Sequence, residues 1–205
     1  MVWLAHKLPP LPIPRKRVSR ASTRRISAGT RLAESGFTII ELMIVMLIIA
    51  ALITVAAPSL KTMILTNQVR SATSDFLSDI AMSRSEASRR SQRVVLCASN
   101  DQNTCTSSAN WAAGWISFVD ADNNGQRNTA GVTEPILRVK DAVSSSVRFT
   151  TTPTGVGDIR FRAIGVIDAA KSIAICPVAT GTSVTGRSIT INALGRVQTV
   201  NATCP

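Results

Sequence analysis

The spacing of apolar residues predicts a membrane-spanning helix near the start of the chain. Phe37 to Ala57 is an almost unbroken apolar run of 21 residues, and Glu41 is its one charged residue. At a rise of about 1.5 Å per residue, a helix of this length spans about 30 Å, which is the hydrocarbon thickness of a bilayer. We therefore expect 37–57 to be a transmembrane segment.

Beyond Pro58 the pattern becomes that of an amphipathic helix. Apolar or small residues recur every three or four positions, at Leu65, Val69, Ala72, Phe76, Ile80, Ser83 and Ala87. Polar residues lie between them, at Thr66, Asn67, Arg70, Ser74, Asp75, Asp79 and Arg84. Because 3.6 residues make one turn, the first set forms a single stripe along a helix. Since this period resumes after Pro58, the proline is expected to bend the helix and not to end it.

The helix is expected to end near Ser91, and its last turns carry an ion pair. Glu86 and Arg90 are four positions apart, which brings them together on the exposed side of a helix. We therefore assign 58–92 to an amphipathic helix that continues the membrane segment into a globular head, 93–205.

The head is expected to consist of short strands. Eight stretches rich in Val, Ile, Thr or Phe are separated by Gly, Asn, Asp and Ser: Val94–Ala98, Trp115–Val119, Ile136–Val139, Val147–Thr150, Ile159–Ala163, Ser172–Cys176, Ser188–Asn192 and Val197–Val200. In the fifth stretch, apolar residues alternate with Arg160 and Arg162, which indicates a half-buried strand with an arginine face. The predicted fold class is α+β, with one long N-terminal helix packed against antiparallel sheet.

Residues 1–36 form a basic leader. They contain eight Lys or Arg and one acid, Glu34, whereas the rest of the chain carries 15 basic and 11 acidic residues. Most of the net charge of +11 therefore belongs to the leader, where it fits the positive-inside rule for membrane segments. The alternative is that the translation start is assigned too far upstream and that part of 1–30 is never made.

Glu41 needs an explanation, because a carboxylate inside a membrane costs about 2.5–3.5 kcal/mol and is normally paired. Cleavage between Gly36 and Phe37 would create an α-amine four residues away. That amine could belong to the same helix or to an adjacent copy of the chain.

Two other export signals fit the apolar segment less well. A secretory signal peptide would be cut near Ala57, but Pro58 directly after that point disfavours cleavage and Glu41 interrupts the apolar core. Arg24 and Arg25 suggest a twin-arginine signal, but no matching consensus follows them.

The sequence Gly36-Phe37-Thr38-Ile39-Ile40-Glu41-Leu42, followed by the apolar run and Pro58, resembles the type III leader of type IV pilins and type II secretion pseudopilins. The resemblance implies that a prepilin peptidase cuts after Gly36 on the cytoplasmic side and that Phe37 is N-methylated. It also implies that Glu41 registers the subunit by pairing with the amine of a neighbour. The leader is longer than is usual for that family, which agrees with a start assigned too early.

Five further stretches, one at the end of the helix and four in the head, indicate which branch of these pilin-like proteins the chain resembles. They are Arg84-Ser85-Glu86-Ala87, Val94-Val95-Leu96-Cys97, the run from Trp111 to Asp120, Glu134-Pro135-Ile136-Leu137-Arg138 and Gly195-Arg196-Val197. Together they resemble the minor pilin family that includes type II secretion protein H and the pilus biogenesis protein FimT. The implied function is assembly with other pilins or pseudopilins in a type II secretion or type IV pilus machine. The implied location is the inner membrane, with a single pass and the head in the periplasm.

All four cysteines, Cys97, Cys105, Cys176 and Cys204, lie beyond the apolar segment. An even number of cysteines in an exported domain suggests two disulfides, for which three connectivities exist. We expect pairing of neighbours, Cys97 with Cys105 and Cys176 with Cys204. The one histidine lies in the leader, and the cysteines lack the close pairs typical of zinc sites, so no metal or cofactor is expected.

Two further features favour structural explanations. Asp120-Ala121-Asp122-Asn123-Asn124-Gly125 begins like a calcium loop, but Gly131 stands at position twelve and Glu134 comes three residues later. Such clusters are also common in tight turns, so we expect a turn. Trp111 and Trp115 are expected to pack in the core and not to form a ligand platform.

DNA binding is the second functional hypothesis. It rests on Arg160 and Arg162 on one strand and on Arg187 and Arg196 beside the last strand pair. FimT-like proteins implicated in DNA uptake carry a C-terminal Gly-Arg-x-Arg, but here Gln198 replaces the second arginine, and scattered surface charge is the simpler explanation. Enzymatic motifs are missing from the sequence after residue 36, so catalysis is not expected. A membrane-anchored domain that forms no filament is the third hypothesis, and it leaves Glu41 without a role.

Overall fold

The computed structural model describes residues 36–131, 134–155, 157–179 and 183–204. The chain divides into two compact units after Ile44, and the head belongs to the second, Val45–Pro205. The leader 1–36 lies outside the described residues except for Gly36, so its predicted role is not addressed by the fold.

One long helix precedes all of the strands. Helix α1 runs from Ile39 to Arg90 and contains Pro58 in its interior, so the proline does not end it, as expected. The helix ends where Ser91 adopts a left-handed conformation with φ of 52°. The N–H of Gln92 then donates to the carbonyl of Ala87 at 3.3 Å, which closes the last turn.

The strands form two antiparallel sheets of four strands each. The first has the order β3-β2-β1-β5 and the second the order β4-β6-β7-β8. The bounds are β1 Arg93–Ala98, β2 Trp115–Asp120, β3 Ile136–Lys140, β4 Val147–Thr152, β5 Asp158–Phe161, β6 Lys171–Pro177, β7 Gly186–Ile191 and β8 Val197–Ala202. A short 3-10 helix, Trp111–Ala113, precedes β2. The α+β class is confirmed, and the eight predicted strands are all present.

The predicted fifth strand was too long at its C-terminal end. It was expected to reach Ala163, but β5 ends at Phe161 because the chain turns there. The N–H of Gly165 donates to the carbonyl of Arg162 at 2.7 Å, and the N–H of Arg162 donates to the carbonyl of Val166 at 2.8 Å. Gly165 has a φ of 77°, which glycine adopts without strain.

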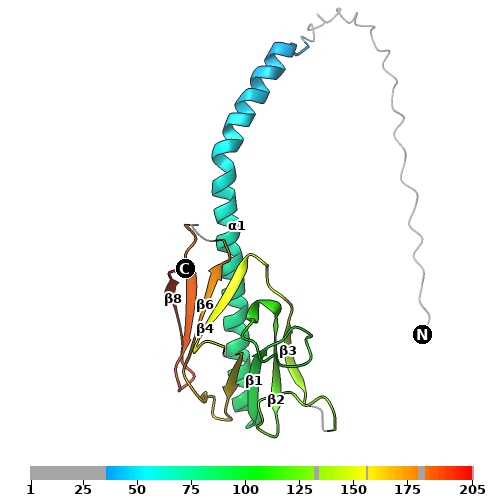
Figure 1. Cartoon of the computed structure of the whole chain (residues 1–205), viewed down its shortest axis with the longest axis vertical. Helices are drawn as coiled ribbons and strands as arrows, with labels where there is room; N and C mark the ends of the chain where they lie inside the picture. The colour runs from blue at the N-terminus through cyan, green and yellow to red at the C-terminus, as the bar shows by residue number, and fades with distance from the viewer. Residues whose placement is uncertain (1–35, 132–133, 156, 180–182, 205) are drawn as a thin grey trace, which may run out of the picture. The chain divides into compact units, whose positions relative to one another are not determined.

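Both sheets pack on the C-terminal half of α1, which lies behind the strands in the view of Figure 1. Every residue of the predicted stripe is buried: Leu65, Val69, Ala72, Phe76, Ile80, Ser83 and Ala87. Inward-facing residues of both sheets complete the same core, among them Leu96 of β1, Ile173 of β6 and Ile189 of β7. The helix is therefore an integral part of the head, and the head's position along α1 is fixed by this stripe.

Candidate processing and assembly site

The start of α1 is capped by Thr38. Its Oγ1 accepts the backbone N–H of Glu41 at 3.2 Å, and its carbonyl accepts the N–H of Leu42 at 3.2 Å. Such a cap typically contributes about 1 kcal/mol to a helix. The sequence signal for it, Thr-x-x-Glu over 38–41, is that of a capping box, and it was missed in the sequence analysis. Thr38 therefore sets the first turn of the helix next to the Gly36–Phe37 bond.

Nothing among the described residues requires glycine at position 36. A Cβ built there would have no heavy atom within 4 Å. The next residue, Phe37, has 77% of its surface exposed, although it is a large apolar residue. The fold thus explains neither the glycine nor the exposed phenylalanine.

Glu41 is exposed in the first turn of α1. Within residues 36–131, 134–155, 157–179 and 183–204, its carboxylate takes part in no ion pair and accepts no hydrogen bond. Its N-terminal position on the helix is favourable for a carboxylate, because the helix dipole is positive at that end.

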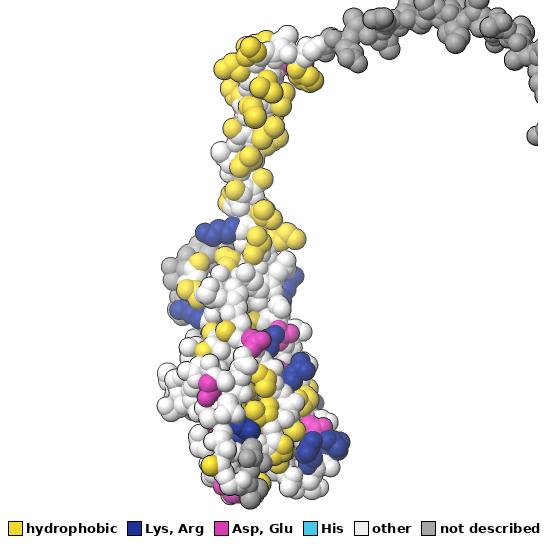
Figure 2. Space-filling view, turned by 90° about the vertical axis from the view of Figure 1, so that its right-hand side faces the viewer, with side chains coloured by type: hydrophobic (Ala, Val, Ile, Leu, Met, Phe, Trp, Pro, Cys, Tyr) yellow, Lys and Arg dark blue, Asp and Glu magenta, His cyan; other side chains and the backbone are white. Residues whose placement is uncertain are grey.

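The N-terminal half of α1 exposes apolar side chains. Figure 2 shows hydrophobic side chains gathered along this part of the helix. They include Ile39, Leu47, Leu52, Ile53, Leu60 and Met63, each more than half exposed. By length and composition α1 qualifies as a helix that could cross a membrane. An apolar surface of this extent marks a membrane or protein contact.

A buried carboxylate ties the C-terminal half of α1 to the first sheet. Asp79 was placed among the polar residues between the stripe positions, but its exposed fraction is only 2%. It accepts the indole N–H of Trp115 at 2.7 Å and the Nε–H of Arg138 at 3.0 Å. Its position, three residues after Phe76 and four before Ser83, lies at the edge of the stripe, so the spacing could have revealed its burial.

A second polar contact follows one turn later on α1. The hydroxyl of Ser83 lies 2.8 Å from the hydroxyl of Ser117 on β2, and both residues are fully buried. Because buried polar groups need partners, these two serines fix the register between the helix and the sheet.

An aromatic cluster fills the space between α1 and the strands. The ring of Phe76 lies edge-on to Trp111, Trp115 and Phe149, with centroids 5.0, 5.2 and 5.6 Å away. Both tryptophans are fully buried, so the prediction that they are core residues is confirmed.

The cysteines form two disulfides, Cys97–Cys105 and Cys176–Cys204. This is the pairing of neighbours that the sequence predicts. The second bond joins Cys204, which follows β8, to Cys176 of β6, 28 positions earlier. A Cβ at Gly186 would lie 2.3 Å from the sulfur of Cys204, so the close approach of β7 to this disulfide requires glycine.

The four arginines of the DNA hypothesis do not form one patch of free charge. Arg160 bonds Asp158, and the Nε of Arg162 lies 2.6 Å from the carboxylate of Asp168. Arg187 lies opposite Asn201 in the β7–β8 ladder, whereas Arg196 stands just before β8, at the turn end of the same hairpin. This geometry does not support the four-arginine patch, and DNA binding stays an untested prediction.

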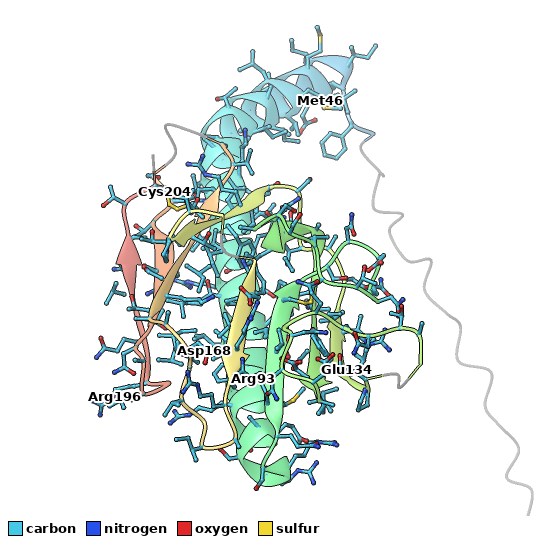
Figure 3. All side chains as sticks on the ribbon, turned by 60° about the horizontal axis from the view of Figure 1, so that its bottom comes forward. Met46, Arg93, Glu134, Asp168, Arg196 and Cys204 are labelled. Atoms are coloured by element: carbon cyan, nitrogen blue, oxygen red, sulfur yellow. A yellow bond between two sulfur atoms is a disulfide. The ribbon has the colours of Figure 1, made fainter. Side chains whose placement is uncertain are left out.

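Asp168 pairs with two arginines, of which only Arg162 belongs to these four. Arg93 of β1 reaches it at 3.1 Å in addition to Arg162, and Figure 3 shows Arg93 beside Asp168 and away from Arg196. Partial burial raises the pKa of the Asp168 carboxyl. The hydrogen bond from Arg162 and the charges of Arg93 and Arg162 outweigh that effect and leave the pKa below its ordinary value.

The arginines at the end of α1 have separate structural tasks. Arg84 donates from Nη1 to the carbonyl of Gly195 at 2.9 Å, which joins the helix to the β7–β8 turn. The predicted Glu86–Arg90 pair is present at 2.6 Å, and Arg89 joins it at 2.7 Å. Hydrogen bonds from Arg89 and Arg90 lower the pKa of the Glu86 carboxyl to about 2.

Comparisons with known proteins agree with these features. The family model described as "Type II transport protein GspH" matches residues 72–195, and the "Prokaryotic N-terminal methylation motif" matches residues 31–57. No protein with a curated description matches the chain.

The solved structures that are similar to the chain include a minor pilin and a minor pseudopilin. One is the type IV minor pilin FimU of Pseudomonas aeruginosa, with 23% identity and a TM-score of 0.50 over 64% of this chain and 87% of that one. The other is the minor pseudopilin EpsH from the type 2 secretion system of Vibrio cholerae, with 12% identity and a TM-score of 0.41 over 64% of this chain and 94% of that one. The likeness to FimU shows a shared, pilin-like fold.

Proposed function

Because the chain belongs to the type II transport protein GspH family and carries the N-terminal methylation motif, we propose that it is a minor pilin or pseudopilin, cut after Gly36 and assembled through α1. The observation that carries this proposal is the Gly36–Phe37 junction. The glycine has no conformational or packing role among the described residues, and a large apolar side chain follows it in the open. A peptidase that needs a small residue before its cleavage point accounts for the glycine, and packing of α1 against other subunits would cover the phenylalanine.

Glu41 is the proposed assembly residue. After cleavage the α-amine of Phe37 is four residues away, on a helix whose first turn is fixed by the Thr38 cap. Since the Glu41 carboxylate has no partner within the described part of the chain, the amine of a neighbouring subunit can pair with it. A charge pair formed in apolar surroundings is strong only with a matched partner, so it selects one register between adjacent helices.

The exposed apolar half of α1 supports membrane anchoring before assembly and helix packing afterwards. From Ile39 to Ala57 all side chains except those of Glu41 and Thr54 are apolar, as in a segment surrounded by lipid or by other apolar helices. We place the anchor in the inner membrane with the head in the periplasm. The two disulfides support a periplasmic location of the head, because disulfides form and persist in oxidising compartments.

The experiment is an intact-mass measurement on protein extracted from membranes, with and without a prepilin peptidase in the host. With the peptidase we expect a polypeptide that starts at Phe37 and carries one added methyl group. Gly36→Ala is expected to be processed partly and Gly36→Leu not at all, because the cleavage site must accommodate a small side chain. A mature start at Ala57 or Pro58, or processing that does not depend on the peptidase, would overturn the proposal.

A further inference from the structure

Three carboxylates meet where β2 ends. Asp120 is the last residue of β2, Asp122 follows in the connection to β3, and Glu134 returns just before β3 begins. One oxygen of each carboxylate lies within 4.8 Å of the others. Asp120 and Glu134 are each only 1% exposed, whereas Asp122 is open to solvent. Figure 3 shows Glu134 beside the β2–β3 connection.

Backbone contacts hold two of these side chains in place. Glu134 accepts the N–H of Ala121 at 2.7 Å on one oxygen and the N–H of Asn128 at 2.9 Å on the other. Asp120 accepts the N–H of Gly125 at 3.1 Å through Oδ2. Residues 121–128 therefore lie around the carboxylates, because three of their backbone N–H groups donate to Asp120 or Glu134.

The negative charge gathered there is offset only in part within the described residues, where the charge of Arg93 favours the ionised form of Asp120. Oδ1 of Asp120 is buried and has no hydrogen-bond partner among them. The three carboxylates take part in no ion pair of the described chain, since the nearby cations Arg93 and Arg160 are bonded to other aspartates. Burial and the charge of Glu134 raise the pKa of the Asp120 carboxyl. A buried carboxylate oxygen without a partner is costly, and a bound cation at this position would satisfy Oδ1 of Asp120.

We propose that the carboxylates of Asp120, Asp122 and Glu134 form a binding site for one calcium ion. A turn without a ligand, which is what the sequence suggests, leaves Asp120 Oδ1 unsatisfied. The order Asp-x-Asp-x-Asn-Gly from Asp120 matches the first half of a calcium loop. Glu134 would supply the carboxylate ligand that is missing at position twelve, because its side chain extends from the start of β3 to the two aspartates.

Calcium fits this donor set better than other common cations. The cluster offers only oxygen atoms, which excludes it as a typical zinc site, and its irregular arrangement suits calcium better than the strict octahedron of magnesium. Three carboxylates supply three to six of the six to eight oxygens that calcium takes, and water can supply the rest. An affinity on the order of 10⁻⁴–10⁻³ M, as in extracellular calcium modules, is expected.

The test is a calcium titration of the full-length protein in detergent, after metal has been removed with EGTA. Isothermal titration calorimetry measures binding, and the thermal midpoint of unfolding measures stability. We expect one calcium ion per chain and a midpoint that rises with calcium concentration. Magnesium is expected to give a weaker response at the same concentration. Asp120→Asn should reduce the affinity at least about tenfold, because one ligand charge is lost.

Asp141→Asn is the matched control, because it removes one exposed carboxylate outside the cluster and should leave calcium binding unchanged. In EGTA, Asp120→Asn should be at least as stable as the wild type, because an amide can still accept the Gly125 N–H without adding charge. If the wild type binds no calcium, binds magnesium more tightly, or binds calcium as well after Asp120→Asn, the proposal is wrong. A loss of stability in Asp120→Asn that is the same with EGTA and with calcium would assign Asp120 a structural role instead.

Discussion

Two aspartates one turn apart on α1 allow a direct test of what burial contributes to the helix–sheet contact. Asp75 pairs with Lys140 of β3 at 2.7 Å, and Asp79 pairs with Arg138 of the same strand at 3.0 Å. The side chain of Asp75 is 40% exposed, whereas that of Asp79 is 3% exposed. The two sites share the helix, the charge and a basic partner on β3, and they differ in solvent access and in the indole N–H that only Asp79 accepts.

The expected costs of replacing each aspartate by alanine differ accordingly. Asp75→Ala removes an exposed ion pair and should cost less than about 1 kcal/mol of unfolding free energy. Asp79→Ala leaves the buried indole N–H of Trp115 without its acceptor, which alone costs about 1–3 kcal/mol. Arg138 also loses its partner, but it is 56% exposed and water can replace the carboxylate. We therefore expect Asp79→Ala to cost about 2–4 kcal/mol in total.

The assay is urea unfolding of the full chain in detergent, followed by the fluorescence of the buried tryptophans. Alanine raises helix propensity equally at both sites, so the difference between the two variants reports the burial of Asp79 together with its hydrogen bond from Trp115. A double-mutant cycle of Asp79→Ala with Trp115→Phe should give a coupling energy of about 1–3 kcal/mol. Equal costs for the two aspartates, or a coupling near zero, would refute the assignment of Asp79 as the buried link between helix and sheet.

Three further predictions concern the head. Gly195→Ala should lower the free energy of unfolding by about 1–3 kcal/mol and Gly155→Ala by about 1 kcal/mol. Both glycines have positive φ, but only at Gly195 would a Cβ lie 2.3 Å from a backbone carbonyl oxygen. Thermal unfolding of the two variants compares the losses. Replacing Cys176 and Cys204 by serine should lower the unfolding free energy by about 3.6 kcal/mol in the chain-entropy model, and an unchanged urea midpoint would contradict it. Asp168→Asn should cost about 0.5–1 kcal/mol of unfolding free energy at neutral pH and nothing in strong acid. Folding lowers the pKa of this carboxyl, so its stabilisation is present above the unfolded pKa and is lost as the pH falls through the folded pKa. Parallel urea titrations of wild type and variant across pH measure the difference.

The helix and the strands could be predicted because apolar residues recur along them at the regular spacing typical of each element. The stripe from Leu65 to Ala87 is buried throughout, and the strands keep to their predicted ranges within a few residues. The division into two sheets could not be read from the sequence, since strand order depends on contacts between distant residues. The early end of β5 was missed because the Arg162–Val166 turn interrupts an alternating pattern that continues to Ala163.

The candidate sites, like the fold, could be predicted only in part from the sequence. The pattern around Gly36 and Glu41 is local and can be recognised in sequence, as can the pairing of neighbouring cysteines. Asp79 was assigned to the polar residues between stripe positions, because aspartates are rarely buried. Its spacing at the edge of the stripe permits burial, but its partners Trp115 and Arg138 are distant in sequence. The closeness of Asp120 and Glu134 was likewise hidden, since it arises from the path of the β2–β3 connection.

The most direct test of the account is whether the chain enters filaments through Glu41. In cells that carry the secretion or pilus machinery, the filament fraction is sheared off and probed for the head by immunoblotting. We predict that the wild-type chain is present and that Glu41→Ala is absent from filaments, although it is still processed and retained in the membrane. Glu86→Ala, which removes a half-buried carboxylate from the other end of the same helix, should enter filaments normally. Incorporation of Glu41→Ala at the wild-type level, or absence of the wild-type chain from filaments, would contradict assembly through the N-terminal helix.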